Sequence, residues 1–291
     1  MILSVAMGTN DHQRHLSHSA RLKLIFCILC VFAIVAPRLR AQESDEFDSY
    51  KLKLAGFWLY SSPSGTIESS VENGAIDLQK DLGFNSYSTG AGKIDWKFTH
   101  KNHFYLVGVA FNSSRQVVLY RTITFKDQTF EAGLTTQSKL SSPVYAPGYQ
   151  YDIIRRKRGH LGLAVQCNLF DTHASINAAA QVTSDGVRHA AVSATASLLA
   201  PIPVAGPEVR YYLADSPRVY VEANVYGMYF FGYGNFVSSA GDLGFTINKH
   251  LSVNAGYQLG SRLVVTSDAS TNRIGLRLTQ TGPIVGAEIS F

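Results

Sequence analysis

Cysteine is scarce in this 291-residue chain: there are three, and Cys27 and Cys30 stand inside an apolar run near the N-terminus. A redox or metal site placed there would lack water and further ligands, so this C-x-x-C spacing predicts neither. Only Cys167 remains beyond the run, which excludes an internal disulfide. Hydrogen bonds and burial must therefore hold the fold together.

Long hydrophobic segments are also missing. The longest apolar run, Leu24 to Ala36, has 13 residues, whereas a helix needs ~20 to cross a bilayer. Because Arg21 and Lys23 precede the run and Ala41 offers a cleavage site, the segment is typical of a secretory signal; an uncleaved membrane anchor is the alternative. We predict a signal peptide with an extended N-terminal region over 1–41, a short acidic periplasmic tail over 42–49 and the folded part over 50–291.

The folded part has almost no excess of positive charge. Residues 1–41 contribute +4 to the formal net charge of +5, which leaves 21 basic and 20 acidic groups after them. The charge balance therefore gives no support to a nucleic-acid partner.

The chain has instead an alternation with a period of two, which a helix cannot satisfy. Apolar side chains occupy every second position, with polar or small ones between them, in the segments 93–99, 160–169, 219–226 and 251–260. In a membrane such strands must close into a barrel, because an unpaired backbone group in hydrocarbon is costly.

The spacing of turns predicts the number of strands. Short polar turns near 101–102, 155–159, 215–218 and 248–249 alternate with long connections over 61–88, 115–143 and 171–200. With both termini on one side, this pattern indicates a closed antiparallel barrel of about ten strands, with eight to twelve open. The predicted strands are 50–60, 89–99, 104–114, 144–154, 160–170, 203–213, 219–230, 241–247, 251–265 and 272–291. Residues 117–125 are an alternative further strand, and a parity change at Gly282-Pro283 predicts a β-bulge.

Aromatic residues favour a membrane barrel over a soluble fold. Trp58, Tyr60, Trp96 and Tyr257 stand on the apolar face toward segment ends, as girdles at the lipid interfaces require. A soluble exported β-sandwich that binds a ligand would also alternate, and it stays as an alternative.

The last strand ends at Phe291, with Ile289 and Ala287 on the same face. This ending resembles the C-terminal assembly signal of bacterial outer-membrane proteins, and the chain from residue 42 onward resembles the small OmpA/OmpW-like outer-membrane β-barrel families. The resemblance implies an integral protein of the bacterial outer membrane that contacts its lipids. It also implies that the outer-membrane assembly machinery recognises the final strand.

The inward faces of the predicted strands carry both signs of charge. In a barrel of ten strands these groups should pair across a narrow lumen and leave at most a thin water path, which disfavours a large open porin. The predicted lumen residues are Lys51, Lys53, Lys93, Asp95, Lys97, Gln150, Asp152, Arg210, Glu222, Arg273, Arg277 and Glu288.

One motif resembles a catalytic pair. His173-Ala174-Ser175 resembles the His-x-Ser pair of lipid A deacylases, themselves small outer-membrane barrels, in which an acid orients the His and the His activates the Ser. Here Ile176 precedes Asn177, and Asp185 is the nearest acid downstream. We predict that Ser175 and His173 are loop residues.

No cofactor and no metal site is predicted. His100 and His103 have a ligand-like spacing, but a two-residue turn offers no further ligands. Arg155 to Arg158 are predicted to be interfacial cations beside lipid headgroups. The sequence thus predicts a non-enzymatic outer-membrane barrel with a structural or surface-interaction role or restricted passage of small solutes. A surface ligand or solute is left open, and a lipid A acyl hydrolase is the alternative.

Overall fold

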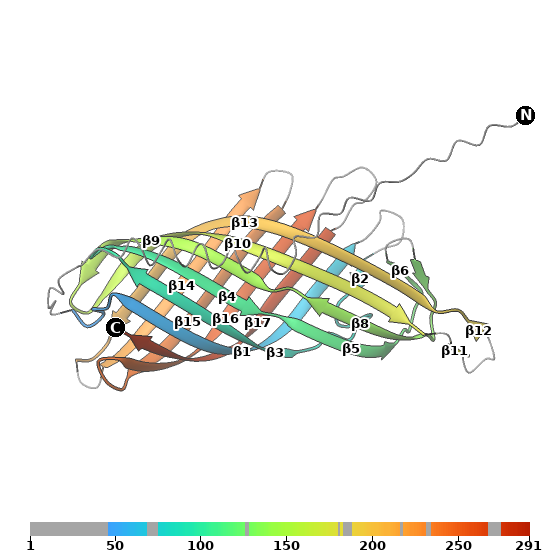
Figure 1. Ribbon diagram of the computed structural model, residues 1–291, viewed down its shortest axis with the longest axis horizontal. Helices are drawn as coiled ribbons and strands as arrows, with labels where there is room; N and C mark the ends of the chain where they lie inside the picture. The colour runs from blue at the N-terminus through green and yellow to red at the C-terminus, as the bar shows by residue number, and fades with distance from the viewer. Residues whose placement is uncertain are drawn as a thin grey trace, which may run out of the picture. The chain divides into compact units, whose positions relative to one another are not determined.

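Ten antiparallel strands close on themselves in the computed structural model of this chain (Figure 1). The structure describes residues 46–68, 75–125, 128–179, 181–182, 188–215, 218–230, 234–266 and 275–291. The strands of the wall are β1 (Leu52–Glu68), β3 (Tyr87–Lys97), β4 (Asn102–Ala110), β9 (Val144–Arg156), β10 (Gly159–Ala178), β13 (Val192–Tyr212), β14 (Arg218–Phe230), β15 (Gly234–Thr246), β16 (Leu251–Thr266) and β17 (Gly275–Ser290). Neighbours in this order pair along the wall, and β17 pairs with β1 to close it. The prediction of a closed barrel of about ten strands is confirmed.

Two shorter strands extend the wall. β5 (Asn112–Val118) continues β4 after Phe111, and β8 (Thr135–Ser141) precedes β9. β8 pairs with β5 on one side and with the second half of β10 on the other. The wall therefore continues beyond the last residue of β4 and the first residue of β9. The remaining strands are short: β2 (Ile76–Asp77), β6 (Ile123–Phe125), β7 (Gln128–Phe130), β11 (Gln181–Val182) and β12 (Arg188–His189).

The two ends of the barrel differ. Short connections at 98–101, 157–158, 213–217 and 247–250 share one end with the C-terminus, which we call the turn end (left in Figure 1). The opposite end, with β2, β5, β6 and β8, is the loop end. The short turns lie where the sequence predicted them.

The predicted long connections are wrong in extent, because strands continue through much of them. β1 runs to Glu68, β10 to Ala178, and β13 begins at Val192. In these extensions the polarity of the two faces is reversed: Ile176 and Ala194 are buried inside while Thr195 is exposed outside. A strand prediction that requires apolar residues on the outer face therefore ends these strands before their true ends.

The predicted bulge occurs one strand away from its predicted position. β1 and β17 pair without any shift in register, so Gly282 is not at a bulge. The extra residue lies in β16 at Leu259–Gly260, where the pairing with β15 and β17 shifts. Before this point even-numbered residues of β16 such as Asn254 face inward. After it odd-numbered residues such as Leu263 face inward, and Leu263 is buried.

The outer face of the turn-end half is an apolar belt. Val165 is 51% exposed there, and Leu54, Ile94, Leu106, Leu163, Val221, Val225, Leu243, Val253, Val285 and Ile289 are also exposed. Trp58, Tyr60 and Tyr257 are exposed at its border toward the loop end. At its border toward the turn end, Phe104 stacks on Trp96 and on Phe98. An apolar band between two aromatic girdles is what a lipid bilayer requires of a barrel. One closed sheet with charges inside also rules out the two stacked sheets of a β-sandwich.

The described residues contain no helix that is long and apolar enough to cross a membrane.

Candidate functional site

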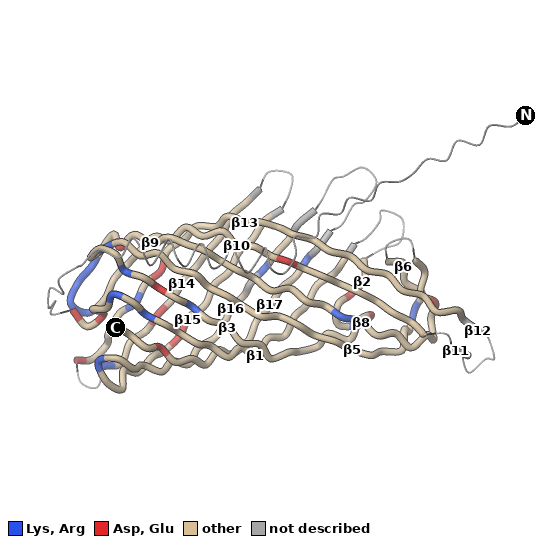
Figure 2. The backbone as a smooth tube through the Cα atoms, in the orientation of Figure 1, with Lys and Arg blue, Asp and Glu red and all other residues tan. Residues whose placement is uncertain are grey.

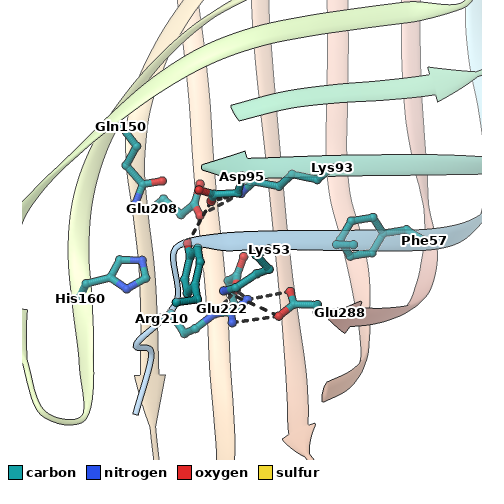
Figure 3. A pocket seen from close by; sticks show the side chains of 12 residues that line it. Lys53, Phe57, Lys93, Asp95, Gln150, His160, Glu208, Arg210, Glu222 and Glu288 are labelled. Atoms are coloured by element: carbon teal, nitrogen blue, oxygen red, sulfur yellow. Dashed lines mark hydrogen bonds and ion pairs between the residues drawn. The ribbon is translucent and has the colours of Figure 1, made fainter. Parts of the chain in front are cut away.

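Charged residues gather in the turn-end half of the barrel, and Figure 2 shows many Lys, Arg, Asp and Glu positions along the backbone at the end that holds the C-terminus. We call the interior group the ionic cluster. It consists of Asp48, Tyr50, Lys53, Lys93, Asp95, Lys97, His103, Asp152, Arg155, His160, Glu208, Arg210, Glu222 and Glu288. Figure 3 shows side chains from several strands converging on this space.

Residues 46–50 fold into the turn end instead of hanging free as an acidic tail. The Phe47 amide donates to the Lys157 carbonyl at 3.0 Å, and the Phe47 ring meets Tyr212 edge to face. Asp48 is only 5% exposed, with its Oδ1 3.1 Å from the Lys53 ammonium. This segment therefore closes the turn end from inside.

Arg210 on β13 is the centre of the cluster. Its guanidinium donates two hydrogen bonds to Glu288 on β17, at 3.0 and 2.7 Å, and pairs with Glu222 on β14. It also lies 4.4 Å from the Tyr220 ring centroid and 3.7 Å from Asp48. One side chain thus ties three strands of the wall to the N-terminal segment.

Tyr50 is held between two ammonium groups. Lys53 and Lys97 lie 4.0 and 3.9 Å from its ring centroid. Its hydroxyl donates to Asp95 Oδ2 at 3.1 Å and lies 3.2 Å from His103 Nδ1. Cation–π contacts are stronger when the charge is removed from bulk water, and both ammonium groups are buried here.

A second group surrounds His103, which is 1% exposed. Its Nδ1 lies 3.2 Å from Asp95 and its Nε2 3.0 Å from Asp152. Arg155 reaches Asp152 at 2.6 Å and Glu46 at 2.6 Å. The imidazole therefore bridges two carboxylates, and Arg155 joins this group to the N-terminal segment.

Farther toward the loop end, Lys93 pairs with Glu208 at 3.4 Å and lies 5.0 Å from the Tyr105 ring centroid. The Tyr226 hydroxyl donates to Glu208 at 2.5 Å, and the Tyr105 hydroxyl donates to Gln166 at 2.9 Å. These tyrosines lie between the charged residues and the apolar interior of the loop-end half.

Glycines in the wall make room for the inward tyrosines. A Cβ at Gly148 would lie 2.3 Å from Tyr105 Cζ, and one at Gly244 would lie 1.9 Å from Tyr220 Cζ. Each ring thus lies over the glycine paired with it on the neighbouring strand, which is how a narrow barrel can hold aromatic side chains as well as ion pairs.

The charge of Asp48 is fixed by its neighbours. Burial alone raises the pKa of a carboxyl, but the positive charges of Lys53, Lys97 and Arg210 and the contact with His160 outweigh it, so the pKa of Asp48 is well below 3.8. His160 Nδ1 is 3.2 Å from Asp48 Oδ2, although the two atoms lack hydrogen-bond geometry.

The structure brings most predicted lumen residues together. Those in the cluster are Lys53, Lys93, Asp95, Lys97, Asp152, Arg210, Glu222 and Glu288, and Gln150 lies beside them. Lys51 is instead exposed at the turn end, and Arg277 is exposed on the outer face. The inward assignment of Arg277 is wrong because its inward neighbour Leu278 packs into the apolar interior of the loop end. Arg273 lies outside the described residues.

The sequence missed several members of the cluster. Arg155 was assigned to the interface, but a bulge at Ile153 shifts the pairing of β9 with β10 and turns Arg155 inward, where its side chain is 3% exposed. His103 was assigned to a turn, but it lies in β4. Glu208 was missed although it alternates with Arg210, a signal that strand parity alone would have given.

The loop end has an apolar interior. The described residues of segments 75–86 and 119–134, which we call the plug, pack onto inward residues of the wall. The core contains Ile67, Ile76, Leu78, Leu82, Phe84, Phe111, Leu119, Ile123, Phe125, Phe130, Leu134, Leu140, Ile176, Ala178 and Ala194. Arg121 joins the two plug segments, because it donates to Asp81 at 2.9 Å and to the Ala75 carbonyl at 2.8 Å.

His173 and Ser175 lie in β10 and not in a loop, so that prediction is wrong. They alternate with the inward residues Ala174 and Ile176 and therefore face outward. The His173 Nε2 lies 3.0 Å from Asp171, which precedes it on the strand, so the ring is turned away from Ser175. No hydrogen bond joins His173 to Ser175 among the described contacts. Asp185 lies outside the described residues.

The predicted assembly residues lie at the edge of the belt. Phe291 is 61% exposed and Ile289 45%, and Ala287 also faces outward. The Phe291 carbonyl accepts hydrogen bonds from the amides of Lys51 and Leu52. Ala41, the predicted cleavage site, lies outside the described residues. Across the described part of the chain no three His, Cys, Asp or Glu side chains are grouped as a metal site.

A closed antiparallel sheet with an apolar outer belt and charges sealed inside is the architecture of integral outer-membrane β-barrel proteins, and this chain is a barrel of that class. No protein-family model and no curated protein matches the sequence.

Three solved structures with a similar architecture are distant in sequence. The outer membrane protease OmpT of Escherichia coli has 11% identity and a TM-score of 0.44 over 84% of this chain and 100% of its own. The translocator domain of autotransporter NalP of Neisseria meningitidis has 11% identity and a TM-score of 0.37, over 94% and 97%. The attachment invasion locus protein Ail of Yersinia pestis has 10% identity and a TM-score of 0.30, over 80% and 99%. At such values no activity passes from these proteins to this chain.

Proposed function

We propose that this protein is a non-enzymatic barrel, closed to free diffusion, that serves a structural or surface-interaction role in the outer membrane. The observation that carries the proposal is the double occlusion of the interior. The ionic cluster around Arg210 fills the turn-end half, and the apolar plug packs into the loop-end half. Passage is then restricted to water and the smallest solutes.

Planar-bilayer recording on the refolded protein tests this proposal. We expect no stable conductance at neutral pH, because ion pairs and apolar side chains occupy successive layers of the lumen. A matched protein lacking the plug segments 75–86 and 119–134 keeps the ionic cluster and should also stay silent. Stable conductance of nanosiemens size in the unaltered protein would contradict the proposal.

The acyl-hydrolase alternative rests on Ser175 and His173. A serine nucleophile needs its histidine within hydrogen-bond reach, whereas His173 contacts Asp171 on the side away from Ser175. We therefore expect that Ser175→Ala leaves the acylation of lipid A unchanged in cells that carry the protein. Altered acylation of lipid A in this variant would support the acyl-hydrolase alternative.

We also propose that the assembly machinery of the outer membrane recognises the last strand. Phe291 projects from the belt beside Ile289, and its carbonyl caps the start of β1. Deleting Phe291 should lower the amount of folded barrel in the membrane, whereas Leu251→Ala, which trims an apolar side chain of the adjacent strand, should lower it less. Equal amounts in both variants would argue against this recognition.

A further inference from the structure

An apolar chamber lies in the interior of the loop-end half. Its volume is about 100 Å³. Its wall is formed by Ile67, Leu78, Tyr87, Val109, Phe111, Phe125, Leu140, Ser142, Val144, Phe170, Thr172, Ala174, Ala196, Ser197, Leu198, Leu263, Leu278 and Gln280. These residues come from strands around the barrel and from both plug segments, so the chamber is bounded by the wall at its sides and by the plug.

Two small side chains explain why the space exists. Ala174 on β10 and Ala196 on β13 are paired directly across the two strands. Both face inward, among larger apolar residues of the chamber lining such as Phe111, Leu140 and Leu278. The pairing of β10 with β13 continues without a shift in register on both sides of these alanines, so the backbone does not close the gap.

A floor separates the chamber from the charges below. Ile202, Val204, Phe236 and Leu263 form a second apolar cluster, with Phe170 and Leu278 packed against it. Since Leu263, Phe170 and Leu278 also line the chamber, this cluster lies next to it. The ionic cluster lies beyond the floor and the Tyr105 and Tyr226 layer.

The chamber offers little to a polar guest. The hydroxyls of Ser142 and Thr172 lie 2.7 Å apart and hydrogen-bond to each other, so one of their two O–H donors is already used within the pair. A charged group would be buried here without compensation, which is expensive. An apolar cavity of about 150 Å³ stays dry and accepts benzene or xenon, and this chamber has a similar scale.

We propose that this chamber is a binding site for a compact, uncharged, apolar molecule of the size of a single hydrocarbon ring. The volume is too small for an extended acyl chain, and the predominantly apolar lining selects against charged ligands. The site lies outside the ionic cluster and does not depend on whether the barrel conducts.

Binding of fluorobenzene to the full chain in lipid nanodiscs, followed by ¹⁹F NMR, tests the site. We expect a saturable protein-dependent signal that empty nanodiscs lack. The double variant Ala174→Leu/Ala196→Leu fills the chamber and should weaken binding at least tenfold. Thr195→Leu adds the same side chain one residue away on the outer face and should leave binding unchanged.

Several results would overturn the proposal. One is a signal no larger than that of empty nanodiscs; another is equal binding by the filled variant. Displacement of fluorobenzene by palmitate but not by toluene would show an acyl-chain site and reject the compact ligand. If the double variant fails to fold, judged by heat-dependent mobility in SDS, Ala196→Val and iodobenzene soaked into crystals of the unaltered protein replace it. Anomalous density in the chamber would then support the site, and its absence there would reject it.

Discussion

The guanidinium of Arg210 holds the carboxylate of Glu288 through two hydrogen bonds, although the two residues stand on strands with three others between them in the wall. Glu222 and Asp48 approach the same guanidinium from β14 and from the N-terminal segment. The ion pairs of the lumen therefore act as cross-braces as well as obstacles.

Replacing the centre of this brace should destabilise the barrel strongly. Arg210→Ala removes the cation that Glu288, Glu222 and Asp48 share, and losing one partner of a buried ion pair costs about 3–5 kcal/mol. Arg158→Ala breaks the exposed pair with Asp215, whose side chains are 44% and 57% exposed, and should cost at most about 1 kcal/mol. Urea unfolding in lipid vesicles measures both. Similar losses in the two variants would mean that the cluster is well hydrated.

The N-terminal segment should release in acid. Because the pKa of Asp48 is lowered from 3.8, its contribution to stability is fully present above that value and is lost as the pH falls toward the folded-state pKa. The melting temperature of the unaltered protein should therefore fall more between pH 6 and pH 3 than that of Asp48→Asn. Other carboxylates titrate in both proteins, so the difference between the two curves isolates Asp48. Parallel curves would place Asp48 in water.

Glycines of the barrel wall should differ in their tolerance to a methyl group. Gly244→Ala drives a Cβ into the buried ring of Tyr220, whereas Gly108→Ala meets nothing within 4 Å. Overpacking of this kind costs about 1–3 kcal/mol, so the melting temperature should fall for Gly244→Ala and stay nearly constant for Gly108→Ala. An unchanged melting temperature in both variants would show that the Tyr220 ring moves aside freely.

The belt half of the fold could be predicted from sequence because lipid and lumen impose opposite demands on alternate residues. Val165 and Gln166, or Val221 and Glu222, leave no doubt about which side each faces. At the loop end the rule is reversed, since Ile176 faces in and Ser175 faces out as in a soluble protein. The sequence contains both patterns without marking where one gives way to the other.

The candidate site was predictable only in part, for a related reason. Lys53, Asp95 and Arg210 follow the parity of their strands and were found. Arg155 depends on a bulge at Ile153, and Asp48 depends on a segment that folds back into the barrel from outside any strand. Neither the bulge nor the folded-back segment can be recognised from the period-two alternation of the sequence. The chamber is still less visible, because it arises from two alanines that become neighbours only when β10 pairs with β13.

The level at which lipid ends can be measured from the same reversal of polarity. Val165 lies in the middle of the belt on β10 and is 51% exposed, whereas Thr195 is exposed on the outer face of the loop-end half of β13. An arginine at the midplane of a barrel costs about 2–4 kcal/mol, and the cost falls to about 0–1 kcal/mol near the interface. Val165→Arg should therefore lower the free energy of unfolding in lipid vesicles by the larger amount, and Thr195→Arg should leave it nearly unchanged because its side chain stands in water. Equal costs would place the loop-end half inside the bilayer, where the exposed serines and threonines of β13 would have no water to meet.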